Sequence, residues 1–266
     1  NINNEQLLQS LIDKNPQKLE EIIQEIYLSY NGAGAKKDPS IIIDKNPFYY
    51  RFIKSIQKKH PQAKYILLVR DYRDRMVSLR KSKFSNQIAN NLVKGIAWNK
   101  RNLQLFKMSS QENTMLIKYE DLVRNPEKTI TNICNFIGVS FEPQMINFHQ
   151  KETHDYEKIG TSEEMQQHIQ DMHKRSSTAI NTNRIGIWKN QLSNKTVSKL
   201  ETFCGKTGEL FGYEKSLNNT FFKNIQNRIV LMPPIVKGVI LLFLKKKSFS
   251  LPYPIQKMAI KLFKRK

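Results

Sequence analysis

The feature that most constrains the fold is a short apolar run that ends in charged residues. Residues 65–69 read Tyr-Ile-Leu-Leu-Val, a continuously apolar stretch. Such a strand is typical of a parallel sheet that helices cover on both faces. Arg70 and Asp71 follow at once, and Asp74 can cap a helix that carries Met76 and Val77. We therefore expect a buried strand that passes through a polar turn into a helix.

Strand and helix patterns alternate along the rest of the chain. The apolar runs 41–43 and 114–117 predict two further strands. Apolar residues at helical spacing predict helices over 5–30, 47–60, 86–107, 126–137 and 194–207. We expect the glycines of Gly205–Gly208 to end the last of these helices. Strands that alternate with helices indicate the α/β class, with a parallel sheet flanked by helices.

Polar side chains follow each predicted strand. They are the pairs Asp44–Lys45, Arg70–Asp71 and Tyr119–Glu120. The carboxyl ends of parallel strands share one edge of the sheet, and ligands of such sheets bind beyond that edge. We expect the three pairs to converge there.

Arg70 and Ser78 are the first candidates for an anion site at that edge. A guanidinium can bind a phosphate with two hydrogen bonds. A hydroxyl close to a helix N-terminus adds a donor where the helix dipole favours anions. The alternative is that Arg70 pairs with Asp71 or Asp74 and that Ser78 only caps the helix.

The segment from Val69 to Leu79 resembles the 3′-phosphate motif of sulfotransferases, with Tyr72 where the family has Pro or Gly. The resemblance implies that Arg70 and Ser78 bind the 3′-phosphate of the donor 3′-phosphoadenosine 5′-phosphosulfate (PAPS). Two further blocks are similar to family elements in the same order.

The block 119–126, followed by Phe-Ile-Gly at 136–138, is similar to a family element whose Tyr contacts the adenine end of the donor. The resemblance gives this role to Tyr119, which by itself would be interpreted as a packing residue. Gly-Ile-Trp-Lys at 186–189 resembles the element that closes over the nucleotide, which implies Lys189 and then Arg184 as phosphate ligands. The alternative is a core Trp with solvated cations.

Residues 44–48 resemble an element of the tyrosylprotein sulfotransferases and their bacterial relatives, the branch that this chain is most similar to. There a Lys, here Lys45, stabilises the charge that develops on the donor. The alternative is a surface Lys45 paired with Asp44. In the same branch a Ser before the late Trp assists the transition state, and Ser176 and Ser177 are the candidates, of which we select Ser177.

The resemblance spans residues 40–213 and implies a P-loop-NTPase-like sulfotransferase fold that requires no metal. The family's loop for the 5′-phosphosulfate, of the type Arg-Ser-Gly-Thr-Thr after an earlier strand, is not found in this sequence. The Gly-rich stretch 31–37 follows a helix and is interpreted as a linker. We expect the N-terminal strand and this loop to precede Asn1, so that residues 1–214 form an N-terminally incomplete sulfotransferase domain.

Charge and composition add a prediction about the last part of the chain. The formal net charge is +21, from 44 Lys and Arg against 23 Asp and Glu, and no acidic residue follows Glu214. Residues 215–266 interleave apolar and cationic groups and predict a basic amphipathic appendage. It either lies on an anionic membrane surface or packs against the domain.

The predicted function is transfer of a sulfuryl group from PAPS to a hydroxyl of a glycan, a lipid-linked sugar or a protein tyrosine. The alternative is a non-catalytic remnant of the fold that binds a nucleotide or a membrane. Charge alone suggests nucleic acid as a partner, and no motif supports it, so none is expected. Two cysteines without metal-ligand spacing favour a reducing compartment, hence the cytoplasm. The basic appendage would place the protein at the membrane periphery if it lies on a membrane surface.

Overall fold

The computed structural model describes residues 2–29, 39–46, 49–80, 91–150, 178–232 and 236. The chain divides into two compact units. The first holds the described residues up to Ile53, and the second holds those from Lys54 onward.

The first unit contains two helices where one was predicted. They are α1 (Asn4–Lys14) and α2 (Leu19–Leu28). Asn15 ends α1 in the left-handed conformation, with φ 43°, and Pro16 follows it. A left-handed residue satisfies the last helical carbonyls, and a proline cannot continue the hydrogen-bond ladder. The prediction of a single helix over 5–30 was therefore wrong.

The predicted strand at 41–43 is absent from the structure. The described residues 41–46 belong to no helix or strand, and the three isoleucines are exposed. A β-branched run favours a strand only where a neighbouring strand pairs with it. The short 3₁₀ helix η1 (Tyr49–Arg51) follows, and α3 (Ile53–Lys59) begins after it.

The second unit is built around two parallel strands, β1 (Tyr65–Val69) and β2 (Thr114–Lys118). The register pairs Tyr65 with Thr114 and Val69 with Lys118. The connection between the strands contains α4 (Tyr72–Arg80) and α5 (Asn91–Met108). The α/β class with a parallel sheet flanked by helices is confirmed.

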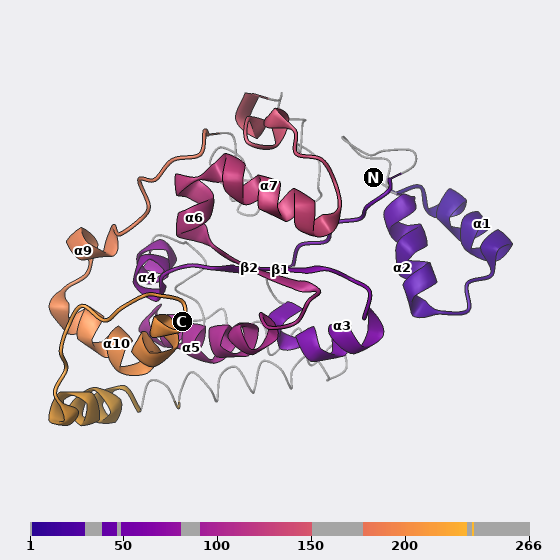
Figure 1. Cartoon of the computed structure of the whole chain (residues 1–266). Coiled ribbons are helices and arrows are strands. Elements are labelled where there is room, and N and C mark those ends of the chain that lie inside the picture. The colour runs from indigo at the N-terminus through magenta and orange to yellow at the C-terminus, as the bar shows by residue number, and fades with distance from the viewer. Residues whose placement is uncertain are drawn as a thin grey trace, which may run out of the picture. The chain divides into compact units, whose positions relative to one another are not determined.

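Helices lie on both sides of this sheet (Figure 1). The remaining described elements are α6 (Tyr119–Arg124), α7 (Pro126–Ile137), η3 (Pro143–Met145), η4 (Phe148–Gln150), α9 (Trp188–Gln191), α10 (Asn194–Glu209) and a helical segment over 221–232. In Figure 1, α6 and α7 lie above the sheet, and α5 and α10 lie below it.

Strand β1 is covered less completely than its sequence predicted. Tyr65, Leu67 and Val69 are buried, whereas Ile66 is 41% exposed and Leu68 is 54% exposed. Helix α7 packs against β2 on that side of the sheet. The expectation of a strand buried on both faces was therefore wrong for the described residues.

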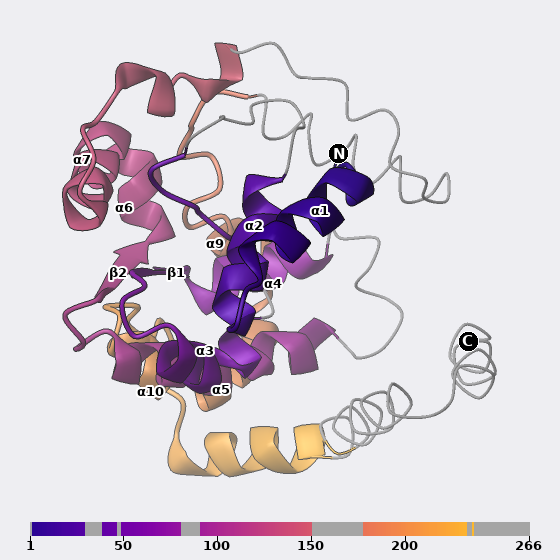
Figure 2. The same ribbon diagram turned by 90° about the vertical axis from the view of Figure 1, so that its right-hand side faces the viewer.

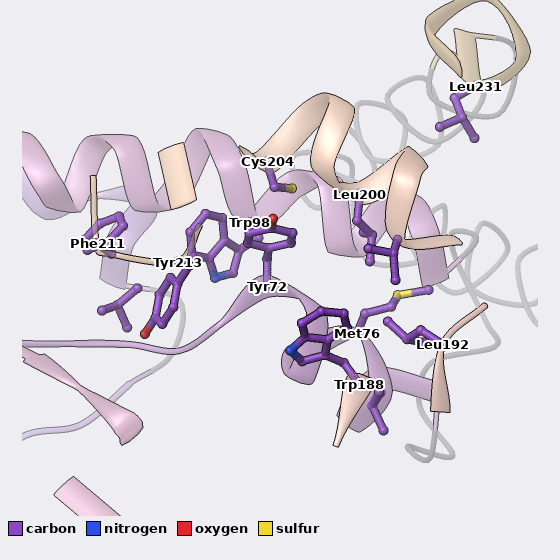
Figure 3. Packing of buried hydrophobic residues seen from close by; sticks show 13 residues of the cluster. Tyr72, Met76, Trp98, Trp188, Leu192, Leu200, Cys204, Phe211, Tyr213 and Leu231 are labelled. Carbon is purple, nitrogen blue, oxygen red and sulfur yellow. The ribbon is translucent and has the colours of Figure 1, made fainter. Parts of the chain in front are cut away.

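The core lies between the sheet and helices α4, α5 and α10 (Figure 3). Tyr72 packs against Trp98, with ring centroids 5.4 Å apart. Gly208 lets α10 approach this pair, because a Cβ there would lie 2.7 Å from the Tyr72 ring. The prediction that Gly205–Gly208 ends the helix was wrong, since α10 continues to Glu209.

Several residues between 216 and 227 form hydrogen bonds with α10. Leu231 of the helical segment 221–232 belongs to the core cluster (Figure 3). The division at 214/215 stays a prediction, and so does the role of the run 239–244, which lies outside the described residues. No helix among the described residues is long and apolar enough to cross a membrane.

Candidate functional site

Arg70 stands where β1 ends, and three contacts fix its position. Its main-chain oxygen accepts a hydrogen bond from the indole nitrogen of Trp98, at 3.0 Å. Its guanidinium carbon lies 4.2 Å from the centroid of the Tyr119 ring. Its Nη2 donates to the main-chain oxygen of Arg184, at 2.6 Å. The contact with Trp98 fixes the main chain of Arg70. The Tyr119 ring and the Arg184 carbonyl then hold its guanidinium in one orientation.

The guanidinium of Arg70 has unused capacity to donate hydrogen bonds. Its Nε is buried and has no hydrogen-bond partner among the residues that the structure describes. A buried donor without an acceptor costs about 1–3 kcal/mol, which an anionic ligand would recover. This orphaned donor is the feature of the site that fits a phosphate.

The alternative that Arg70 pairs with a neighbouring carboxylate is not what the structure shows. The Asp71 carboxylate pairs instead with Arg73, at 2.8 Å. The Asp74 carboxylate accepts hydrogen bonds from two main-chain amides. No ion pair of Arg70 occurs among the described residues.

Ser78 lies further into its helix than the sequence suggested. Helix α4 begins at Tyr72, and the Asp71 side chain caps it by accepting from the Arg73 amide, at 2.8 Å. The prediction of Asp74 as the cap was therefore wrong. Ser78 is the seventh residue of α4, beyond the first turn in which the helix dipole acts. No hydrogen bond joins the described side chains of Ser78 and Arg70, so the role of Ser78 stays a prediction.

Tyr119 meets Arg70 because of the strand register. Val69 and Lys118 are opposite each other at the ends of β1 and β2. The residues that follow, Arg70 and Tyr119, therefore leave the sheet side by side. This confirms the predicted convergence of two of the three polar pairs. A cation over an aromatic face contributes about 0.5–2 kcal/mol.

Asp74 fastens a distant segment to α4. Its carboxylate is buried and accepts from the amides of Gly186, at 2.7 Å, and Trp188, at 3.0 Å. Burial raises the pKa of Asp74, and the two amides partly oppose that rise. We call these two hydrogen bonds the Asp74 clamp. The clamp fixes the segment that contains Arg184, whose main-chain oxygen accepts from the Arg70 guanidinium.

The predicted phosphate ligands Arg184 and Lys189 are exposed in this segment. Arg184 contributes its main-chain oxygen to the site, and Lys189 lies in α9. Trp188 is a core residue, as the alternative interpretation held, and the Arg73 guanidinium carbon lies 4.1 Å from its ring centroid. The roles of Arg184 and Lys189 as phosphate ligands stay predictions.

A buried charge network behind the turn was missed by the sequence analysis. Arg73 pairs with Asp71, at 2.8 Å, and with Glu201 of α10, at 3.2 Å. Glu201 also accepts from the Ser216 amide, at 2.8 Å, and from the Leu217 amide, at 3.0 Å. All three charged groups are buried. The network fixes the turn that presents Arg70.

Glu120 ties the two strand ends together. It accepts from the Asp71 amide, at 3.1 Å, and from the Tyr213 hydroxyl, at 2.7 Å. Burial, together with the hydrogen bond to Glu120, raises the pKa of Tyr213. The only sequence signal for this role was that Glu120 follows a strand.

The roles of the two predicted catalytic residues stay predictions. Lys45 is exposed and belongs to the first unit. Its alternative partner, Asp44, accepts a hydrogen bond from Tyr49, and no ion pair joins Asp44 to Lys45. Ser177 lies outside the described residues. Within the described ranges, no cluster of His, Cys, Asp or Glu is suited to a metal ion.

Replacing Asp74 with Ala is expected to release the segment at 184–189. Two hydrogen bonds to a charged acceptor contribute about 3 kcal/mol or more, and the burial of that charge offsets part of this, so we expect the free energy of unfolding to fall by about 2 kcal/mol. Trypsin should then cut faster after the exposed Arg184 and Lys189. The matched control is Asp121→Ala, an exposed carboxylate on α6. Unchanged cleavage rates at both sites would contradict the clamp.

Comparisons with known proteins agree on one family. Residues 7–143 match a profile described as the sulfotransferase family. A putative protein-tyrosine sulfotransferase of Caenorhabditis elegans is 25% identical over 185 residues, which are 66% of this chain and 67% of that protein. Rat sulfotransferase 2A1 is 29% identical over 197 residues, which are 67% of this chain and 66% of that protein.

Mouse carbohydrate sulfotransferase 4 is 29% identical over 111 residues, which are 42% of this chain and 26% of that protein. Among solved structures, the sulfotransferase domain of the Synechococcus PCC 7002 olefin synthase superposes with a TM-score of 0.42 and 24% identity, over 74% of each chain. The matches to the three sequence relatives span about two thirds or less of each relative's length.

Proposed function

The chain belongs to the sulfotransferase family, and on this premise we propose that it transfers a sulfuryl group from PAPS to a hydroxyl acceptor. The observation that carries the proposal is the Arg70 guanidinium, which is stacked on Tyr119 and keeps a buried, unpartnered Nε at the carboxyl edge of the sheet. That edge is where ligands of parallel sheets bind. The fixed and incompletely bonded guanidinium suits the 3′-phosphate of the donor.

In this proposal the described residues bind and orient the donor nucleotide. Arg70 and Ser78 hold the 3′-phosphate, and Tyr119 borders the adenine. Lys189 and Arg184, on the segment that Asp74 clamps, add positive charge near the phosphates. PAPS is a polyanion, and a fixed cationic site attracts it electrostatically.

The transfer step itself resembles phosphoryl transfer, where positioning and charge stabilisation supply most of the catalysis. The acceptor hydroxyl oxygen forms a bond to sulfur, and the bond from sulfur to the 5′-phosphate oxygen breaks. The products are the sulfate ester, 3′,5′-ADP and the proton of the hydroxyl. We assign the stabilisation of charge on the leaving phosphate to Lys45 and a supporting hydrogen bond to Ser177.

The acceptor is proposed as a class. The names of the relatives refer to protein tyrosine, carbohydrate and hydroxysteroid substrates, and each of these presents a hydroxyl group. We propose a glycan, a lipid-linked sugar or a protein tyrosine as the acceptor of this chain. We also propose a cytoplasmic protein that works at the membrane periphery.

The test is a transfer assay with sulfur-labelled PAPS and one acceptor from each class. We expect formation of 3′,5′-ADP together with one labelled product. Lys45→Ala should lower kcat at least tenfold and leave the KM for PAPS nearly unchanged, because the charge that this Lys is assigned to stabilise develops only as the bond from sulfur breaks. Lys54→Ala, another exposed lysine, is the control. Nucleotide binding without transfer to any acceptor would instead support a non-catalytic nucleotide-binding role.

A further inference from the structure

The helical segment 221–232 docks on α10 through polar side chains. Asn227 is buried, and its amide donates to the Ser198 hydroxyl, at 3.0 Å, and to the Thr202 hydroxyl, at 2.9 Å. The Thr202 hydroxyl also donates to Asn224, at 2.9 Å. Leu231 is the one side chain of this segment in the core cluster. A surface helix of a soluble protein usually turns an apolar face toward the core. In this segment, the face that contacts α10 is largely polar.

The opposite face of the same segment is apolar and exposed. Its residues are spaced by three and four positions, which places them on one side of a helix. They are Phe222, Ile225, Ile229 and Met232, which are 80%, 38%, 67% and 56% exposed. We call these four residues the apolar stripe. Figure 2 shows the segment as the pale orange helix at the bottom of the view.

Cationic side chains share a surface groove with Ile225, one residue of the apolar stripe. A surface groove of about 640 Å³ runs between α10 and residues 215–228. Lys206, Lys215 and Arg228 line it together with Phe221 and Ile225. Residues 215–266 contain twelve Lys and Arg and no Asp or Glu. Apolar and positive groups are thus adjacent on one surface.

We propose that the apolar stripe binds an anionic membrane surface, with the helix lying in the plane of the interface. Amphipathic helices that bury an apolar face at the headgroup boundary and carry Lys and Arg beside it behave in this way. The positive charge of the chain favours an anionic membrane over a second copy of the chain as the partner of the apolar stripe. A second copy of a chain with a net charge of +21 would bring like charges together, whereas anionic headgroups are complementary to them.

Membrane binding is independent of the proposed transfer reaction, and its test needs no activity. The full chain is mixed with vesicles of phosphatidylcholine alone, or of equal parts phosphatidylcholine and phosphatidylserine, and sedimented. We expect binding to the anionic vesicles, at least tenfold weaker binding to the neutral ones, and weakening by salt. The double variant Phe222→Asp, Ile229→Asp should lower the affinity for anionic vesicles at least tenfold.

The control is Val230→Asp, an exposed apolar residue outside the stripe on the same helical segment. It should keep most of the binding, and the thermal unfolding of both variants should match that of the parent chain. Equal binding of the double variant and the control would overturn the proposal. So would light scattering that shows a dimer which only the double variant dissociates, because the stripe would then be an interface between copies.

Discussion

Replacement of Arg70 by Ala is expected to weaken the binding of 3′,5′-ADP about 100-fold. Hydrogen bonds to charged groups contribute about 1.5–3 kcal/mol, and two parallel bonds from one guanidinium to a phosphate give about 3 kcal/mol, or a factor of about 100 in affinity. The Nε of Arg70, which is buried and has no partner within the described part of the chain, is one donor for such a pair. Titration calorimetry on the folded variant measures the change.

One further variant separates the charge of Arg70 from its geometry, and another serves as a control. Arg70→Lys keeps the positive charge but loses the planar fork, so its affinity should lie between those of the parent chain and Arg70→Ala. Arg124→Ala, an exposed arginine just beyond the site, should bind normally. An unchanged affinity in Arg70→Ala would refute the nucleotide assignment, whatever the transfer assay shows.

Replacement of Arg73 by Met should cost about 3–5 kcal/mol of the free energy of unfolding. The variant leaves the carboxylates of Asp71 and Glu201 in the interior without the guanidinium that lies between them, and removal of one member of a buried ion pair typically has this effect. The cost is a large fraction of the total stability of an ordinary domain. Urea denaturation followed by circular dichroism measures it.

The matched control for this variant is Arg80→Ala, since Arg80 is exposed on the same helix. Its free energy of unfolding should change by less than about 0.5 kcal/mol. Glu201→Gln should lie between the two, because its single amide oxygen can still accept from the Ser216 amide or the Leu217 amide, which bond to different oxygens of Glu201. A normal denaturation midpoint in Arg73→Met would mean that the network does not stabilise the fold.

The pairing of Arg70 with Tyr119 followed from the sequence because it depends on local rules. Two apolar runs of strand length marked β1 and β2, and parallel strands bring the residues at their carboxyl ends together. The same rules located α7, where Pro126 opens the helix and Gly138 ends it with a φ of 88°. Strand ends, caps and turns were predictable where the determining residues are neighbours in sequence.

The rest of the site depends on partners that no local pattern reveals. The clamp of Asp74 on Gly186 joins residues 112 positions apart, and the Arg73–Glu201 pair spans 128 positions. In the sequence alone, Asp74, Arg73 and Glu201 are charged residues whose partners cannot be identified. The wrong strand at 41–43 has the same cause, because a strand depends on a neighbour as well as on its own side chains.

Glu201 also determines when the turn beside Arg70 can be completed during synthesis. A ribosome releases the chain from its N-terminus, so Arg73 emerges long before Glu201, and Glu201 emerges before Ser216 and Leu217. Until those residues arrive, the Arg73 guanidinium lacks one of its two carboxylates, and Glu201 lacks its amide donors. The turn that presents Arg70 is thus finished late, after residue 217 has emerged from the ribosome. A nascent chain stopped earlier carries Arg70 and Tyr119 without the interior that holds them in place.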